Sequence, residues 1–180
     1  MKLRKIAIVT ATLLAAAGIA ASSPAGAATS GGTTVTFQLA GAASLAISVP
    51  GNPAAVSGSV TTGSTVPVTL GSTTVTDNTG SLLGWTVTAD ATDLSDGAGH
   101  TIPKNNMIWL TGSVTAGATG LLTGVSAGGG GAFGATPVPV ALSLANFGGG
   151  TYSYPATVTL TVPVNTFAAT YSTVITQTVA

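Results

Sequence analysis

The sequence predicts an all-β protein, a single antiparallel β-sandwich or barrel-like domain. Apolar and polar residues alternate along most of the chain after residue 28, which places one set of side chains on each face of a strand. The polar positions are mostly Thr and the apolar ones often Val, and both are β-branched residues that favour strands. Clusters of Gly, Pro, Asn and Asp separate the alternating runs. No window of ten or more residues in this region shows helical spacing.

The first 27 residues are typical of a secretory signal peptide. Lys2, Arg4 and Lys5 form a basic start, an apolar run covers residues 6–21, and Ala25-Gly26-Ala27 supplies the small residues that a signal peptidase needs. We therefore expect export, cleavage before Ala28 and one β domain over residues 28–180. An uncleaved anchor helix is the alternative, but the apolar run is short for a span of about 20 residues.

The alternating runs predict ten strands in the mature chain. Val35, Phe37 and Leu39 alternate with polar residues in the first run, and the same pattern recurs around Trp85 and Val87. Gly, Pro, Asn or Asp clusters end most of the runs. The expected strands are 33–40, 44–49, 64–70, 72–77, 83–90, 107–115, 121–125, 138–144, 155–163 and 170–179. Two long loops are expected at 91–106, which holds most of the remaining charge, and at 126–137, which is Gly-rich and expected to be mobile.

The charge of the mature chain excludes several classes of partner. Residues 28–180 hold one lysine, Lys104, against four aspartates, a formal charge of −3 with histidine neutral. One lysine cannot neutralise a run of phosphates or bind an anionic membrane surface, so no nucleic-acid partner is expected. No later stretch is apolar enough to predict a membrane span in the mature chain. Without Cys, an exported chain has neither disulfides nor a lipid-modified cysteine.

Two short motifs formally match catalytic or nucleotide-binding patterns. Gly124-Val125-Ser126-Ala127-Gly128 matches a nucleophile elbow, but glycines follow it instead of a helix, and no acid or histidine comes later in the chain. Gly129–Gly134 matches a dinucleotide-binding loop, but Pro137 and Pro139 prevent the helix that would bind a pyrophosphate. We therefore expect neither an enzyme nor a bound cofactor.

Asp90, Asp93 and Asp96 are the weak candidates for a metal site. Carboxylates on a loop can bind calcium, but their spacing is not that of an EF-hand and the chain has no Glu. One His and no Cys are too few for zinc. A solvated loop with Asp at turn positions is the preferred interpretation, and no metal is expected.

The segment from Val75 to Ala89, which reads VTDNTGSLLGWTVTA, resembles the first signature of WxL-domain proteins, a family of bacterial cell-surface proteins. The end of the chain is similar to the second half of that domain, at Gly149–Tyr152 and at Tyr171–Val179. The opening around Val35–Phe37 and Val49-Pro50 is also similar. The resemblance therefore spans most of residues 33–179.

The chain departs from the family pattern in three places. Val87 replaces Leu in the first Trp-x-Leu motif, Gln177 occupies the position of the second Trp, and Asn78-Thr79 stands where an Arg often follows the Asp. In the family the two motifs are thought to face each other and to support attachment to peptidoglycan. The resemblance thus implies binding residues at Trp85, Val87, Gln177 and Val179, although strand alternation favours a core position for Trp85. Trp109 matches no motif of the family and is expected in the core.

Together these features predict a secreted, extracellular protein that associates non-covalently with the cell wall. Its partner would be peptidoglycan or another wall glycan, or a surface protein complex, bound through an aromatic and Thr-rich strand face. The alternative is a structural subunit that assembles by adding a strand to the sheet edge of a neighbouring copy.

Overall fold

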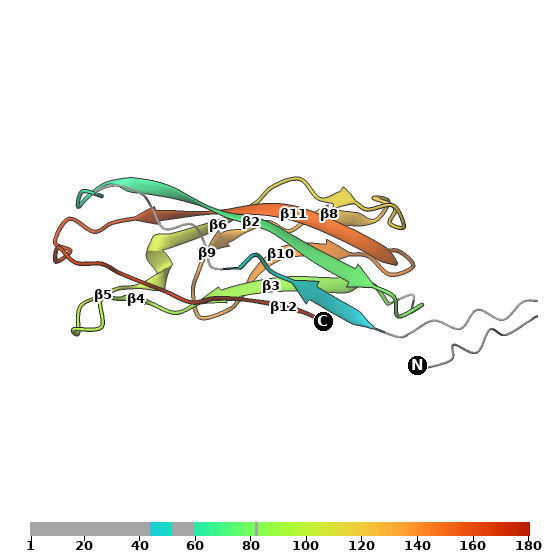
Figure 1. The fold of residues 1–180 in the computed structure, drawn as a ribbon, viewed down its shortest axis with the longest axis horizontal. Helices are drawn as coiled ribbons and strands as arrows, with labels where there is room; N and C mark the ends of the chain where they lie inside the picture. The colour runs from blue at the N-terminus through green and yellow to red at the C-terminus, as the bar shows by residue number, and fades with distance from the viewer. Residues whose placement is uncertain (1–43, 52–59, 82) are drawn as a thin grey trace, which may run out of the picture. The chain divides into compact units, whose positions relative to one another are not determined.

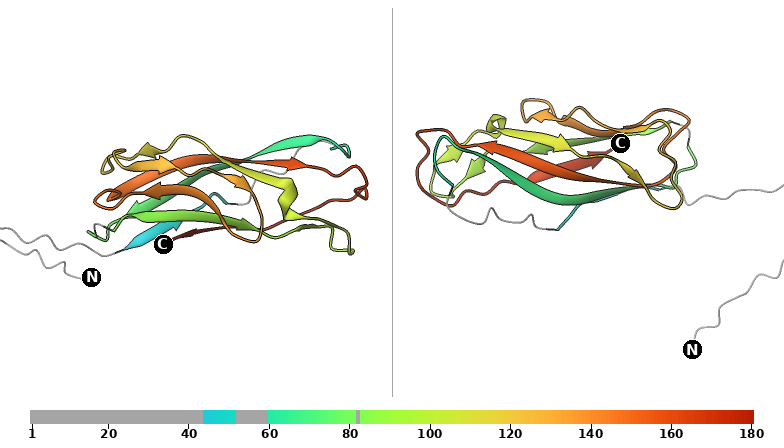
Figure 2. Two further views of the ribbon diagram at one scale, coloured as in Figure 1. Left: turned by 180° about the vertical axis from the view of Figure 1, so that it is seen from behind. Right: turned by 90° about the horizontal axis from the view of Figure 1, so that it is seen from above.

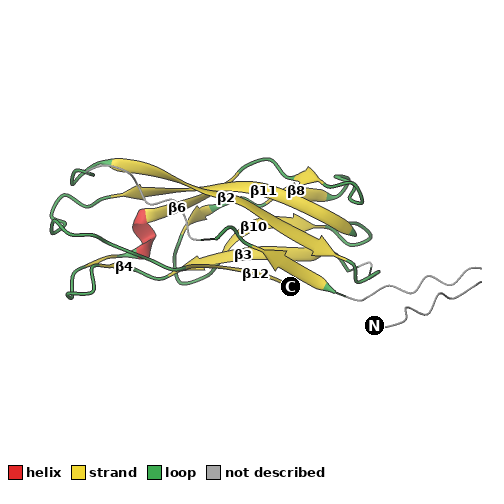
Figure 3. Cartoon of the chain, viewed as in Figure 1, coloured by secondary structure: helices red, strands yellow, loops and turns green. Residues whose placement is uncertain are grey.

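The computed structural model describes residues 44–51, 60–81 and 83–180 and confirms the all-β class (Figure 1). The described residues form twelve strands and one short 3-10 turn, Lys104–Asn106, and every strand pairing is antiparallel. The colouring by secondary structure in Figure 3 shows that loops and strands account for almost everything else. The strand expected at 33–40 lies outside the described residues. None of the described helical residues forms a segment long and apolar enough to cross a membrane.

The larger sheet is built around two long central strands. Its order is β1-β2-β11-β6-β9, and β7 also pairs with β11 beyond the end of β6. The strands are β1 (Leu45–Ser48), β2 (Thr65–Asp77), β6 (Met107–Thr111), β7 (Thr115–Ala116), β9 (Gly131–Ala132) and β11 (Gly150–Thr161).

The second sheet lies across the core from the first and has the order β12-β3-β10-β8 (Figure 2). Its strands are β3 (Trp85–Ala91), β8 (Val125–Ala127), β10 (Val138–Ser143) and β12 (Ile175–Val179). A separate hairpin joins β4 (Leu94–Ser95) to β5 (Thr101–Ile102). Both large sheets have open edges among the described residues, so the domain is a sandwich and not a closed barrel.

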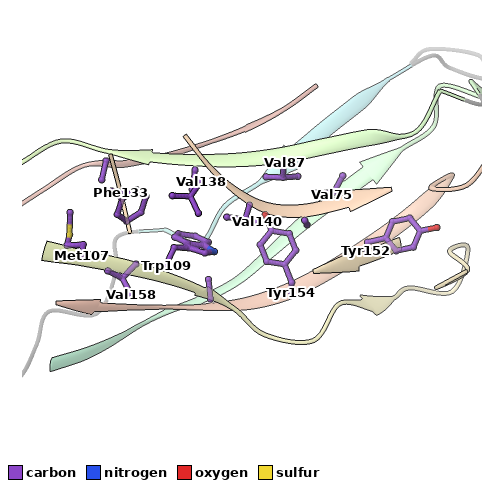
Figure 4. Packing of buried hydrophobic residues seen from close by; sticks show 14 of the residues in the cluster. Val75, Val87, Met107, Trp109, Phe133, Val138, Val140, Tyr152, Tyr154 and Val158 are labelled. Atoms are coloured by element: carbon purple, nitrogen blue, oxygen red, sulfur yellow. The ribbon is translucent and has the colours of Figure 1, made fainter. Parts of the chain in front are cut away.

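The core consists of the inward residues of both sheets. Figure 4 shows Trp109 and Tyr154 pointing from β6 and β11 toward Val87 and Val140 of β3 and β10. Trp109 is fully buried, as expected, and its indole N–H donates to the Thr111 hydroxyl at 2.8 Å. Tyr and Trp bury much apolar area while their polar groups keep hydrogen-bond partners. Because the chain has no Cys, this packing and the strand ladders provide the stability.

A bulge at Gly71 joins two runs that the sequence analysis expects as separate strands, 64–70 and 72–77. The structure has one strand, β2, in which Ala156 of β11 pairs with Gly71 but Thr157 pairs with Thr69. The extra residue shifts the alternation, so that even-numbered side chains turn inward before it and odd-numbered ones after it. Gly71 has φ +84°, a conformation that other residues rarely adopt.

Several expected boundaries are corrected by the structure. The expected strand 107–115 divides into β6 and β7 around Gly112, whose N–H donates to the Pro155 carbonyl at 2.8 Å. The strand expected at 155–163 begins five residues earlier, at Gly150, because Tyr152 and Tyr154 continue the buried alternation. The strand expected at 121–125 is displaced to β8, and the strand expected at 170–179 is shortened to β12. The two regions expected to be loops contain the short strands β4, β5 and β9.

Replacing Gly71 by Ala should lower the free energy of unfolding by about 1–2 kcal/mol, because an L-residue there must take a left-handed conformation. Urea denaturation followed by tryptophan fluorescence would measure this loss. Gly129→Ala is the matched control, since Gly129 has no positive φ and a Cβ there would meet nothing within 4 Å. Equal unfolding midpoints for the two variants would contradict the role given to the bulge.

Candidate functional site

The two Trp-x-Leu-like motifs of the family resemblance, around Val87 and around Gln177, lie on the neighbouring strands β3 and β12. Strand β12 pairs with β3 in antiparallel register, with Val179 opposite Val87 and Gln177 opposite Ala89. Since residues at even spacing share a face, the inward side chains of both segments form one stripe on the inner face of the sheet. Val87 and Gln177 are 90 residues apart in the sequence, and only the fold brings the two strands together.

Trp85 is part of the core and holds the loop after β10 against it through a hydrogen bond. Its side chain is buried, with 3% of the residue exposed, and its indole N–H donates to the Gly148 carbonyl at 3.0 Å. Its ring lies 5.7 Å from that of Tyr152, at a tilt of 52°. The Tyr152 hydroxyl in turn lies 2.9 Å from the Gly149 carbonyl and 3.1 Å from the Leu121 carbonyl. Trp85 and Tyr152 therefore fix the loops after β10 and after β7 against the two sheets.

Close packing around the Trp85 indole requires glycine at position 148. Gly148 has φ +95°, and a Cβ placed there would come 2.7 Å from the indole nitrogen of Trp85 and against the Ser143 side chain. Both the conformation and the lack of space exclude a larger residue. The sequence Phe147–Gly150 thus supplies the backbone carbonyl that the buried Trp85 N–H needs.

The turn that leads into Trp85 is held by hydrogen bonds between alternate residues. One carboxylate oxygen of Asp77 accepts from the backbone N–H and the hydroxyl of Thr79, at 2.9 and 2.6 Å. The Thr79 hydroxyl oxygen accepts from the N–H of Ser81, and the Ser81 hydroxyl oxygen from the N–H of Leu83. Thr79 therefore supplies two hydrogen bonds to the buried carboxylate of Asp77.

Gln177 links the two sheets by hydrogen bonds. Its carbonyl oxygen accepts from the Tyr154 hydroxyl at 2.8 Å, and its amide donates to the Thr73 hydroxyl at 3.0 Å. Tyr154 and Thr73 belong to β11 and β2 of the larger sheet, and neither is exposed. Burial raises the pKa of Tyr154, so this hydroxyl stays protonated and keeps donating. An amide with both a donor and an acceptor fits this position between two hydroxyls, which the indole of Trp could not do.

None of the four residues expected to bind presents an exposed face. Trp85 and Val87 are buried, and Gln177 and Val179 are half-buried with their side chains toward the core. In this structure their side chains pack beneath the outer face of β3 and β12. A binding role for these residues stays a prediction.

Asp90 of β3 and Asp93 and Asp96 of the segment that follows do not converge on one point. Asp90 accepts from the Lys104 ammonium at 2.7 Å, and Asp93 accepts from the Lys104 backbone N–H at 2.8 Å. The hydrogen bond from Lys104 holds the pKa of Asp90 below its usual value. Asp96 lies 2.6 Å from the His100 ring through Nδ1. Within the described ranges, no group of three or more potential ligands could hold a metal ion.

An aromatic depression of about 330 Å³ lies at the end of the sandwich that carries β4 and β5 (Figure 1). The loop between β11 and β12 and the segment around β5 form its walls. The Phe167 ring is stacked on the His100 ring, with centroids 4.3 Å apart and planes 9° apart. Its lining residues are His100, Thr101, Pro103, Pro163, Asn165, Thr166, Phe167 and Tyr171. No sequence pattern identified this site; the available signal was an aromatic residue, Phe167, at the end of the Pro-containing run 163–167.

A second depression, of about 270 Å³, lies beside Tyr152 where the turns after β2, β7 and β10 meet. Phe147 and Leu121 are among its lining residues, and Leu121 is 75% exposed. Exposed Leu83, Leu122 and Leu144 belong to the same turns. This end of the domain is therefore the more apolar of the two.

The motifs that formally match catalytic patterns lack the required structure. Ser126 lies within β8, paired with Leu142 of β10, and a glycine loop follows it instead of a helix. Gly131 and Ala132 of the glycine-rich run form β9, which pairs with Trp109 and Ile108. The described residues 124–137 thus form short edge strands, with no helix to bind a phosphate.

Comparisons with known proteins assign no family. No protein-family model matches the chain, and no curated protein matches it. Among solved structures, a family 123 glycoside hydrolase from Clostridium perfringens, analysed for glycolipid glycan hydrolysis, is similar at 15% sequence identity and a TM-score of 0.38. The match covers 67% of this chain but only 19% of that chain. At this TM-score the similarity supports no conclusion about activity.

Replacing Trp85 by Ala should cost roughly 3–5 kcal/mol of unfolding free energy, because it leaves a cavity and removes the partner of the Gly148 carbonyl. Urea denaturation monitored by the fluorescence of Trp109 would measure the loss. Thr86→Ala, on the exposed face of the same strand, should change stability by less than about 0.5 kcal/mol. A Trp85→Ala protein as stable as the parent would refute the structural role of this residue.

Replacing Gln177 by Ala should destabilise the domain by about 1–3 kcal/mol for each buried hydroxyl left without a partner. The additional change Tyr154→Phe removes one of these hydroxyls and should recover part of the loss. Thermal unfolding of the single and double variants tests this, with exposed Thr178→Ala as the control. If Tyr154→Phe adds its own full cost in the Gln177→Ala background, the two side chains do not act as a pair.

Proposed function

We propose that this chain is an exported bacterial surface protein that attaches non-covalently to the cell wall, with peptidoglycan as its partner and without catalysis. The pairing of β3 with β12 is the observation that carries the proposal. It brings the two motifs onto neighbouring strands, where they meet at Val87 opposite Val179 and Gln177 lies opposite Ala89. The WxL-type resemblance implies that the two motifs face each other for peptidoglycan attachment. The basic and apolar start of the chain supports export.

The outer face of the same two strands has the chemistry of a glycan contact. Thr88 lies opposite Thr178 in the register, and Thr86 and Thr176 continue the row on either side. Three of these threonines are exposed and Thr88 is half-buried. Hydroxyl groups donate and accept hydrogen bonds without charge, which matches the hydroxyl groups of sugars. The inward residues Trp85 and Gln177 would keep this face flat and in register.

Purified peptidoglycan should retain the protein in a pull-down. Removing two hydroxyls with Thr86→Val and Thr178→Val should lower retention severalfold, while thermal stability stays near that of the parent because both side chains are exposed. Thr69→Val, at an exposed site on β2 of the other sheet, is the matched control. Lack of retention of the unchanged protein on peptidoglycan would refute the proposal.

Assembly by strand addition is the second candidate, and the edge of β12 favours it. Thr86 and Ala180 exchange two backbone hydrogen bonds, so the backbone groups of Ile175, Gln177 and Val179 point away from β3. No described strand pairs with that edge. Oligomers that form with rising protein concentration and without glycan, detected by sedimentation velocity, would favour this candidate over wall attachment.

A further inference from the structure

We propose that the aromatic depression around Phe167 is a glycan subsite that binds an uncharged pyranose ring, in particular an N-acetylhexosamine. The inference rests on the proposed attachment to a wall glycan and deepens it, since it names a place and a sugar class. The volume of about 330 Å³ is at the lower end of the roughly 300–1,000 Å³ typical of small-molecule sites. A single sugar unit of a longer chain suits an open site of this size.

Phe167 provides the platform on which a sugar could stack. The residue is 59% exposed although one face of its ring rests on His100. The exposed area therefore includes the opposite face and the ring edge. The C–H groups of a pyranose carry partial positive charge, and the face of an aromatic ring attracts them. The chain has only nine Phe, Tyr and Trp residues among 180. An aromatic side chain as exposed as that of Phe167 therefore stands out.

Hydrogen-bonding groups surround this platform. Asn165 and Thr101 line the depression and are exposed, so an amide and a hydroxyl are available for sugar hydroxyls. Thr166 donates its own proton to the Pro163 carbonyl at 2.8 Å, which leaves its hydroxyl oxygen free to accept. The lining thus combines one aromatic face with several uncharged polar groups, the pattern that fixes the orientation of a small ligand.

The platform is held in place before any ligand binds. The Tyr171 hydroxyl donates to the Phe167 carbonyl at 3.0 Å. Ser172 and Ser95 exchange two backbone hydrogen bonds, which join the loop that carries Phe167 to the loop that carries His100. A preformed site loses less conformational entropy on binding than one that must order its loops.

The charge around the depression favours a neutral ligand over a cationic one. Asp96 contacts the lining through His100, and only 4% of its side chain is exposed. Its oxygens accept from the His100 ring at 2.6 Å and from the backbone N–H groups of Ala98 and His100. The hydrogen bond with His100 keeps the pKa of Asp96 below its usual value, so the carboxylate is ionised but satisfied by the protein. The Asp96 carboxylate is therefore not available to pair with an amine of a ligand.

Isothermal titration of triacetylchitotriose into protein purified from cells that express the full chain tests the proposal. Phe167→Ala should weaken binding about 3- to 10-fold, the effect of losing one stacking contact, while Phe167→Tyr retains it. Val164→Ala is the matched control, because Val164 is exposed on the same loop but does not line the depression. All three variants should melt near the parent temperature, since both positions are exposed.

Failure of the subsite and failure of wall attachment give different results. If trisaccharide binding is absent, or is the same for Phe167→Ala as for the parent, the subsite is refuted; wall attachment stands as long as the parent is retained on peptidoglycan. If the parent is not retained on peptidoglycan but binds the trisaccharide through Phe167, the subsite stands and wall attachment is refuted. Weaker binding of both ligands by Phe167→Ala alone supports the two proposals together.

Discussion

The contact between the inner faces of β3 and β11 is the interaction on which the rest of the structure depends. Trp85 meets Tyr152 across this contact, and Gln177, on the strand next to β3, reaches Tyr154. The chain has no Cys and few charged residues, so burial of these and the other inward side chains, Trp109 among them, holds the described parts of the two sheets together. The same contact positions the outer threonines of β3 and β12 and the loops after β7 and β10. The surface proposed to contact the glycan therefore depends on residues buried beneath it.

The sequence predicts the fold class because period-two alternation is strong and local. It does not predict that Gly71 lies within one strand, since a bulge is defined by a partner strand about 80 residues away. The boundary at Gly150 is missed for a related reason: Tyr152 and Tyr154 continue β11, but the Gly148–Gly150 run before them is also typical of a loop. Local patterns identify strands, whereas pairing partners decide where they begin and end.

The candidate sites were less predictable than the fold. Motif resemblance draws attention to Trp85 and Gln177, and the structure gives both of them core contacts. Phe167 lies in no motif, and its exposure and its stacking on His100 arise only when two loops distant in sequence meet. Residues that bind at a loop surface carry no periodic signal, because no strand or helix face constrains them.

The antiparallel pairing of distant segments has a consequence for how the chain becomes folded. Side chains that bond across β2 and β11 are 79 residues apart, and those that bond beside β3 and β12 are 81 apart. Such non-local pairing makes folding slow, because loop closure must precede the contacts that stabilise it. In the smaller sheet, β3 gains a neighbour on its second side only when β12, the last strand in the sequence, pairs with it. Neither of the two large described sheets can be completed until β11 or β12, near the end of the sequence, is available. This order suits the export proposed above, because a chain that is still unfolded can thread through a translocation channel.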